Sequence, residues 1–334
     1  MPATRHSRHH QVSTWLTARD DAELAAMLAG APTVAVGVGG GCVRLDVEGV
    51  PVFAKRIPIS DRELASPHST ANLFDLPTYC QYGIGGPTFN VWRELAANLV
   101  VSEAVLAGET ESFPLLHHWR VLPGRPPTAA EHLDVDAVLA RVGGAPAAGT
   151  RLAELAAATH SLVLFLEHVG FALPEWLNED PVGRIETAER QISETVAFLR
   201  DHELLHMDGH LGNMRSDGDR IHLVDFGLAT SPRFDLSEPE RGFVARHAGH
   251  DAGYAAMVLV NWLVTTVGGV PTPVSGGPVA RNEYVRRCAG GDIPADVPTV
   301  AAGILARHAP AAARMNEFYW RLFDGDVHAE YPGS

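Results

Sequence analysis

The stretch LLHMDGHLGNMRSDGDRIHLVDFG, residues 204–227, decides how the fold of the whole chain is interpreted. It contains H-M-D, which ends at Asp208, and Asn213 follows five residues later. It closes on D-F-G, which begins at Asp225 directly after the apolar residues 221–224. A loop carboxylate can orient a hydroxyl group, and amide and carboxylate oxygens are suitable ligands for Mg²⁺. We therefore expect Asp208 to act as a base and Asn213 and Asp225 to hold a metal ion.

Upstream of this stretch, Lys55 is the single lysine among 26 lysine and arginine residues. A compact ammonium can enter a closed phosphate site that the broad guanidinium fork of arginine does not fit. Residues 37–41 read GVGGG between two expected strands, where backbone N–H groups can approach phosphate oxygens without a Cβ in the way. We expect phosphates to lie between Lys55 and this turn. The turn glycines expected to contact them are Gly37, Gly39, Gly40 and Gly41.

The periodicity of the chain predicts an α+β protein whose first part is rich in strands and whose second part is mainly helical. A capping box at Asp20 and Glu23 opens a helix in an N-terminal extension, residues 1–30. A long helix is expected at 89–106, with one apolar face made by Trp92, Ala96, Leu99 and Leu106. The expected strands are 33–36, 42–47, 50–57, 113–122 and 162–166.

The pattern changes from strands to helices near Glu167, so we place a lobe boundary there. Residues 31–166 form the first predicted lobe, with loop-rich insertions at 58–87 and 123–150, and residues 167–334 form the second. Helical pieces are expected on either side of Gly143-Gly144 in the second insertion.

The composition is that of a globular protein, because 46% of the 334 residues are hydrophobic and 20% are charged. A net charge of −14 argues against a nucleic-acid surface. Three widely spaced cysteines favour a reducing compartment over a disulfide framework. The most apolar stretch, 255–267, is too short to span a bilayer. We expect a soluble, cytoplasmic protein without a nucleic-acid or membrane partner.

The order of these motifs resembles that of the protein kinase-like superfamily, which includes bacterial Ser/Thr protein kinases and the aminoglycoside and choline phosphotransferases. The resemblance covers residues 34–263. It implies a bilobal fold with a β-rich N-lobe and a helical C-lobe, and it implies ATP and Mg²⁺ as cofactors. A helical glutamate should form an ion pair with Lys55; Glu94 is our choice, with Glu103 and Glu63 as alternatives.

The same resemblance implies roles for three other regions. Residues 162–169 resemble the strand that leads into the hinge, so the backbone of Glu167 and Val169 should bind adenine. Residues 184–200 resemble the long helix before the catalytic loop. Residues 251–263 resemble the buried helix whose first residue, Asp251, braces that loop.

The acceptor of the phosphoryl group is the least determined part of the prediction. A protein Ser/Thr kinase is slightly favoured by the glycine turn, the D-F-G and the helix that begins at Asp251. A small-molecule phosphotransferase, acting on an aminoglycoside-like or other hydroxyl compound, is supported by His210 where protein kinases carry lysine. Met207 stands where many protein kinases carry the arginine that binds a phosphorylated loop, so regulation of that kind is not expected. A pseudokinase that binds nucleotide without turnover is a third hypothesis.

A zinc site is the competing interpretation of the same region. His202-Glu203-Leu204-Leu205-His206 matches H-E-x-x-H, in which two histidines on one helical face bind Zn²⁺. The helix would have to continue through Gly209, and the position of a third histidine holds Gly212. We therefore favour the phosphotransfer interpretation.

Overall fold

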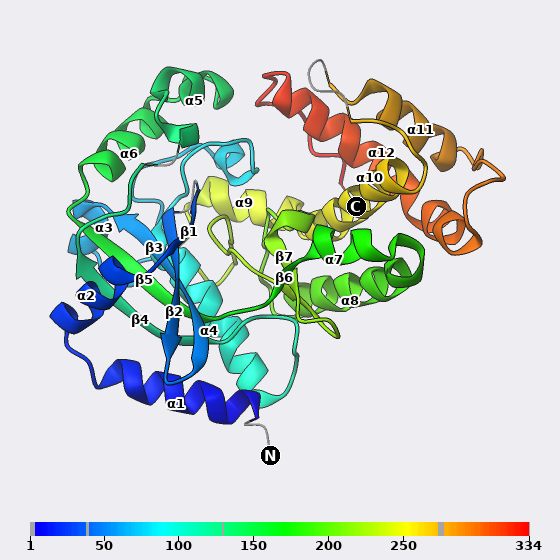
Figure 1. The fold of residues 1–334 in the computed structure, drawn as a ribbon. Helices are drawn as coiled ribbons and strands as arrows, with labels where there is room; N and C mark the ends of the chain where they lie inside the picture. The colour runs from blue at the N-terminus through cyan, green and yellow to red at the C-terminus, as the bar shows by residue number, and fades with distance from the viewer. Residues whose placement is uncertain (1–3, 38–39, 129, 273–276, 334) are drawn as a thin grey trace.

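The computed structural model describes residues 4–37, 40–128, 130–272 and 277–333 (Figure 1). It is an α+β protein in which about half of the residues are helical, and its larger sheet has five antiparallel strands. The predicted α+β class is therefore confirmed. The sheet order is β1-β2-β3-β5-β4, and the strands are β1 (Thr33–Gly37), β2 (Gly40–Val47), β3 (Val50–Ile59), β4 (Leu116–Pro123) and β5 (His160–Glu167).

Strand β3 lies in the middle of the sheet and carries Lys55. In its register Lys55 pairs with Cys42 on β2 and with Leu164 on β5. Side chains alternate between the two faces of a strand. Val52 and Ala54 therefore belong to the core on one face, whereas Lys55 and the residues at 57 and 59 point to the other.

Helices cover both faces of this sheet (Figure 1). Helices α1 (Arg5–Thr17) and α2 (Asp21–Gly30) cover the face of Val52, and α4 (Val91–Ala107) covers the face of Lys55. The capping box predicted for α2 is present, since Asp20 and Glu23 exchange side chain-to-backbone hydrogen bonds.

Helix α4 does not have the single apolar face that the periodicity predicts. Leu99 and Leu106 are each 39% exposed, so that part of the prediction is wrong. The helix is instead buried on two sides: Leu95 packs under the sheet, whereas Val101 and Val105 join a second core that includes the helices of the C-terminal half. A helix buried on two sides does not display one apolar stripe.

The rest of the chain is mainly helical. A small antiparallel sheet has the order β6-β7-β8, with β6 (Phe171–Ala172), β7 (Met214–Ser216) and β8 (Ile221–Leu223). Short 3₁₀ turns occupy η1 (Thr78–Gln81), η2 (Ala130–His132) and η3 (Leu211–Asn213). The remaining helices are α3 (Asp61–Ala65), α5 (Val135–Arg141), α6 (Pro146–Ala157), α7 (Leu173–Glu179), α8 (Pro181–Asp201), α9 (Glu238–Arg246), α10 (His250–Thr266), α11 (Val279–Ala289) and α12 (Thr299–Phe323).

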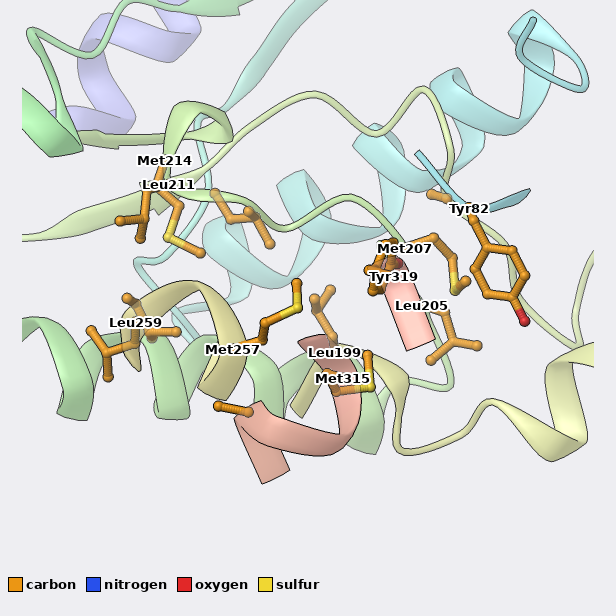
Figure 2. Close-up of a cluster of buried hydrophobic side chains, with 14 of the residues drawn as sticks. Tyr82, Leu199, Leu205, Met207, Leu211, Met214, Met257, Leu259, Met315 and Tyr319 are labelled. Carbon is orange, nitrogen blue, oxygen red and sulfur yellow. The ribbon is translucent and has the colours of Figure 1, made fainter. Parts of the chain in front are cut away.

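The loop that carries Asp208 packs on a cluster of buried hydrophobic side chains (Figure 2). Helices α8, α10 and α12 supply residues of this cluster, and Tyr82 of the first insertion belongs to the same core. Close packing of this kind restricts the loop backbone. The labelled members of this cluster are Tyr82, Leu199, Leu205, Met207, Leu211, Met214, Met257, Leu259, Met315 and Tyr319. Within the described ranges, no helix is long and apolar enough to cross a membrane.

Candidate active site

Lys55 lies at the centre of an ion-pair network that is buried at Glu94 and open to solvent at Asp225, whose side chain is 40% exposed. Its side chain is 6% exposed, and its Nζ donates hydrogen bonds to Glu94 Oε1 at 2.7 Å and to Asp225 Oδ1 at 2.8 Å. The choice of Glu94 as its partner is confirmed. Of the two alternatives, Glu63 pairs with Arg151, and Glu103 is exposed on α4. Strand β3, helix α4 and the D-F-G segment therefore meet at one ammonium group.

The electrostatics of this network keep the lysine charged. Burial alone would lower the pKa of Lys55, but the Asp225 and Glu94 carboxylates outweigh it and raise the pKa above its ordinary value. Burial would raise the pKa of Asp225, but Lys55 outweighs it, so the pKa is lowered. Burial raises the pKa of Glu94 to about 7, although Lys55 opposes this shift. A charged ammonium beside an ionised Asp225 is suited to a site for phosphate and metal.

Asp208 lies in the loop between Leu205 and η3, and the side chain of Asn213, the last residue of η3, contacts it. The Asn213 side-chain Nδ2 donates to the Asp208 carbonyl at 3.0 Å and to Asp208 Oδ2 at 3.2 Å. His210 Nε2 lies 3.8 Å from the same carboxylate oxygen. Burial raises the pKa of Asp208, while His210 and His206 oppose the shift. The loop thus presents a partly buried carboxylate with an amide and an imidazole beside it.

The donor set fits a magnesium ion shared with phosphate. Among the described residues, the contacts of the Asp225 carboxylate go to Oδ1, from Lys55 and from the Gly227 N–H, which leaves Oδ2 for a metal. Because the Asn213 amide nitrogen is turned toward Asp208, the side-chain carbonyl oxygen of Asn213 is left available as a second ligand. Mg²⁺ commonly takes one or two protein ligands and completes its shell with phosphate and water.

Asp251, the second residue of α10, braces the loop as predicted. Its carboxylate accepts hydrogen bonds from the backbone N–H of His206 at 2.6 Å and of Met207 at 3.0 Å. The His206 ring contacts the Val224 carbonyl at 3.0 Å, which joins the loop to the strand before Asp225. Met207 and Asp225 each adopt a left-handed backbone with φ of 67°. Such conformations cost free energy and persist only where surrounding contacts hold them.

The glycine turn is described only in part, because Gly39 lies outside the described residues. Gly37 pairs with Gly40 at the ends of β1 and β2. Gly40 has a φ of 122°, and a Cβ there would lie 2.0 Å from the Arg56 carbonyl oxygen. A Cβ on Gly41 would lie 2.7 Å from Pro126. The close approach of these segments requires glycine at both positions, next to the Cys42–Lys55 pair.

The side chain of Glu167 holds the N-terminal helix at the end of β5. Arg5 donates to both Glu167 carboxylate oxygens, with a shortest distance of 2.6 Å, and the Leu115 N–H donates to Oε2 at 3.1 Å. Burial would raise the pKa of Glu167, but Arg5 outweighs it and lowers it. Val169 is buried, and no described residue accepts a hydrogen bond from its N–H. Nothing in the sequence pairs Arg5 with Glu167.

The first insertion reaches the centre of the site through Gln81 and Gly83, two residues that the sequence did not single out. A Cβ placed on Gly83 would lie 2.6 Å from Asp208 Oδ1. Gln81 donates its side-chain amide to the carbonyl of Leu228, directly after the D-F-G. The dense run of glycines at 83–86 is the only feature in the sequence that indicates a close backbone approach here.

The zinc interpretation is wrong because its helix ends too early. Helix α8 closes at Asp201, and Glu203 has a left-handed φ of 55°. His202 contacts Glu109 at 3.1 Å, far from the His206–Val224 contact. The two histidines therefore do not share a helical face. Within the described part of the chain, no three His, Cys, Asp or Glu side chains are placed to hold a metal.

No known protein-family model matches this chain, and no curated protein matches it either.

Proposed function

We propose that the protein is an ATP- and Mg²⁺-dependent phosphotransferase that transfers the γ-phosphate to a hydroxyl acceptor. The observation that carries the proposal is the position of Lys55, 2.7 Å from Glu94 and 2.8 Å from Asp225. A lysine oriented by a helical glutamate beside a metal-binding aspartate is the arrangement that protein kinase-like enzymes use for phosphates.

Each side chain has a distinct task in this proposal. Lys55 binds and neutralises phosphate oxygens, and Asp208 accepts a hydrogen bond from the acceptor hydroxyl and orients it for attack. Asp225 and Asn213 hold Mg²⁺, which when bound neutralises further phosphate charge. Because phosphoryl transfer needs little covalent help, positioning and charge neutralisation supply most of the catalysis.

We also propose the bilobal arrangement that this chemistry uses. The five-stranded sheet with α4 would be the N-lobe, within residues 31–166, and residues 167–334 would be the C-lobe. The adenine ring would bind where β5 ends, at the backbone of Glu167 and Val169. The Val169 N–H, which donates to none of the described residues, supports this placement.

Two classes of acceptor are proposed. The first is a Ser or Thr side chain of a protein, and the second is a small hydroxyl compound, which the position of Gly83 supports. Gly83 packs against Asp208 and the buried Gln81 donates to Leu228, so an acceptor has to fit next to the chain's own insertion. A compact substrate fits such a boundary more easily than an extended polypeptide. The pseudokinase hypothesis is disfavoured because the charged residues that transfer requires are all present.

The test is to follow the label from γ-labelled ATP. The protein, Mg²⁺ and labelled ATP are incubated with extract of the source cell, and macromolecules are separated from small molecules. Phosphotransfer is supported if label appears in either fraction and is lost with Asp208→Ala. The control is Asp219→Ala, which changes an exposed loop aspartate and should keep the label. The fraction that carries the label identifies the acceptor class. Bound ATP with no transfer to any acceptor contradicts the proposed activity.

A further inference from the structure

Arg93 is a buried cation one residue before Glu94 in the first turn of α4. Its side chain is 1% exposed. Its Nη2 donates to Glu240 Oε1 at 2.6 Å, and its Nε donates to the Thr70 carbonyl at 2.6 Å. The guanidinium also lies over the rings of Phe89 and Phe234. Helix α4, the first insertion and α9 therefore meet at Arg93.

Glu240 is the second half of this contact and is shared with the start of α9. Its side chain is 6% exposed, and its Oε2 accepts hydrogen bonds from the Ser237 N–H at 2.9 Å and the Ser237 hydroxyl at 2.7 Å. The segment between Asp225 and α9 is joined to the insertion again where the Asp235 N–H donates to the Thr70 hydroxyl at 2.8 Å. One carboxylate thus caps α9 and receives Arg93.

The insertion also surrounds the start of α4. The Asn90 side-chain amide donates to the carbonyls of Ser69 and Ala71 at 2.8 and 2.9 Å. The Val91 N–H donates to Glu63 Oε1 at 2.9 Å. The position of the helix turn that carries Glu94 is therefore set by contacts within the chain.

We infer that Arg93 and Glu240 are positioning residues that hold Glu94 at Lys55 by fixing the start of α4 to α9. The inference rests on the proposed function, because it concerns how that site is assembled. Arg93 binds a carboxylate of the chain itself, so the site can be assembled without phosphorylation of a side chain to bind Arg93. An uncompensated buried charge is unfavourable, so losing either partner displaces the other, and α4 with it.

The test uses the fact that Lys55 is the only lysine of the chain. Acetylation of its amine by an excess of acetylating reagent, measured by mass spectrometry of the Lys55 peptide, reports how often the ammonium leaves Glu94 and Asp225. The variants are Arg93→Met, Glu240→Gln and the double variant, with Glu238→Gln as the matched control because Glu238 is exposed in the same turn of α9. Val285→Ala is the control for a general loss of stability, because Val285 is a buried residue of α11, which lies far from α4 (Figure 1).

Acetylation of Lys55 is expected to be at least about tenfold faster in Arg93→Met and Glu240→Gln than in the wild type, because a local opening exposes the amine. The double variant regains thermal stability relative to the single variants but keeps the fast acetylation and a lowered kcat. Glu238→Gln acetylates at the wild-type rate. Acetylation in Arg93→Met and Glu240→Gln that is no faster than in Val285→Ala overturns the inference. A wild type without phosphotransfer overturns the proposed function alone, since the acetylation rates still decide the role of Arg93.

Discussion

Gly83 lies so close to Asp208 that a methyl group on its Cα would stand 2.6 Å from the carboxylate oxygen Oδ1. The contact joins the first insertion to the loop that carries the proposed base. Because the opposing atom is the end of a side chain, a larger residue at position 83 displaces the Asp208 carboxylate rather than the backbone.

Gly83→Ala is therefore expected to lower kcat by about tenfold or more, since a misplaced base loses its alignment with the acceptor. The KM for ATP should change little. Steady-state kinetics at saturating ATP provide the measurement. Gly209→Ala is the matched control, because a Cβ there meets no atom within 4 Å. Equal kcat values for Gly83→Ala and Gly209→Ala would show that the contact has no catalytic role.

Lys55→Arg should abolish phosphotransfer although it keeps the charge. The guanidinium is a planar fork and does not fit between Glu94 and Asp225 as a compact ammonium does. A loss of about 100-fold or more in kcat/KM is expected. Arg44→Lys, an exposed position on β2, should leave the rate unchanged. Near wild-type activity in Lys55→Arg would contradict the role assigned to the ammonium.

Asp251→Asn should slow transfer by about 10- to 100-fold while nucleotide binding persists, because an amide has one acceptor oxygen for two backbone N–H groups. The loss should appear in kcat, since His206 and Met207 position the loop rather than the nucleotide. Calorimetric titration with ATP and Mg²⁺ checks that binding is retained. A variant that loses nucleotide affinity but keeps its turnover rate would refute this assignment.

Glu63→Ala should destabilise the protein by about 3–5 kcal/mol, because it leaves Arg151 charged and buried without a carboxylate. The two side chains are 0% exposed and form two hydrogen bonds of 2.7 Å. Glu194→Ala, which removes the half-exposed partner that Arg190 and Arg220 share, should cost at most about 1 kcal/mol. Urea unfolding of the two variants measures the contrast. Similar midpoints in both would show that the buried pair contributes no more than a surface pair.

The stability of the fold should fall as the pH drops from about 6.5 to about 4. Burial, with a smaller contribution from the neighbouring His9 at 3.0 Å, lowers the pKa of His117 to about 4. The unfolded chain binds a proton in this range that the folded chain does not, so unfolding is favoured as pH falls. His117→Phe should reduce this slope, whereas exposed His10→Phe should not. Unfolding free energies measured at several pH values in this range test the prediction, and parallel slopes for the wild type and His117→Phe would disprove it.

Sequence reasoning located the strands because they follow from short-range patterns, whereas the Lys55–Glu94 contact was an expectation of the resemblance to protein kinase-like enzymes, since the two residues are 39 positions apart. The alternation along β3 determines the face of Lys55, and the spacing from Asp208 to Asn213 and Asp225 fits a loop followed by two short strands. The apolar pattern predicted the buried helix that carries Asp251, whereas the contact of Asp251 with the loop was an expectation of the resemblance. Their catalytic and metal-binding roles remain predictions.

The contacts of Gly83, Arg93 and Arg5 could not be predicted in the same way. Each joins segments that are far apart in the chain and come together only when the whole protein packs. Arg93 resembles any surface cation in the sequence, and only the structure places it on Glu240. The exposed face of α4 was misassigned for a related reason, because its second packing partner lies in the C-terminal half.

The contact between Arg5 and Glu167 also bears on the synthesis of the protein. The two partners are 162 residues apart, and Val12 and Leu16 of the same helix are buried in a core that also contains Phe165. During translation, α1 is made long before β5, so its apolar side stays uncovered until β5 has been made. Such delayed pairing slows folding and leaves a surface on which nascent chains aggregate. The apolar side of α1 is thus a surface that a chaperone would have to protect until β5 has been made.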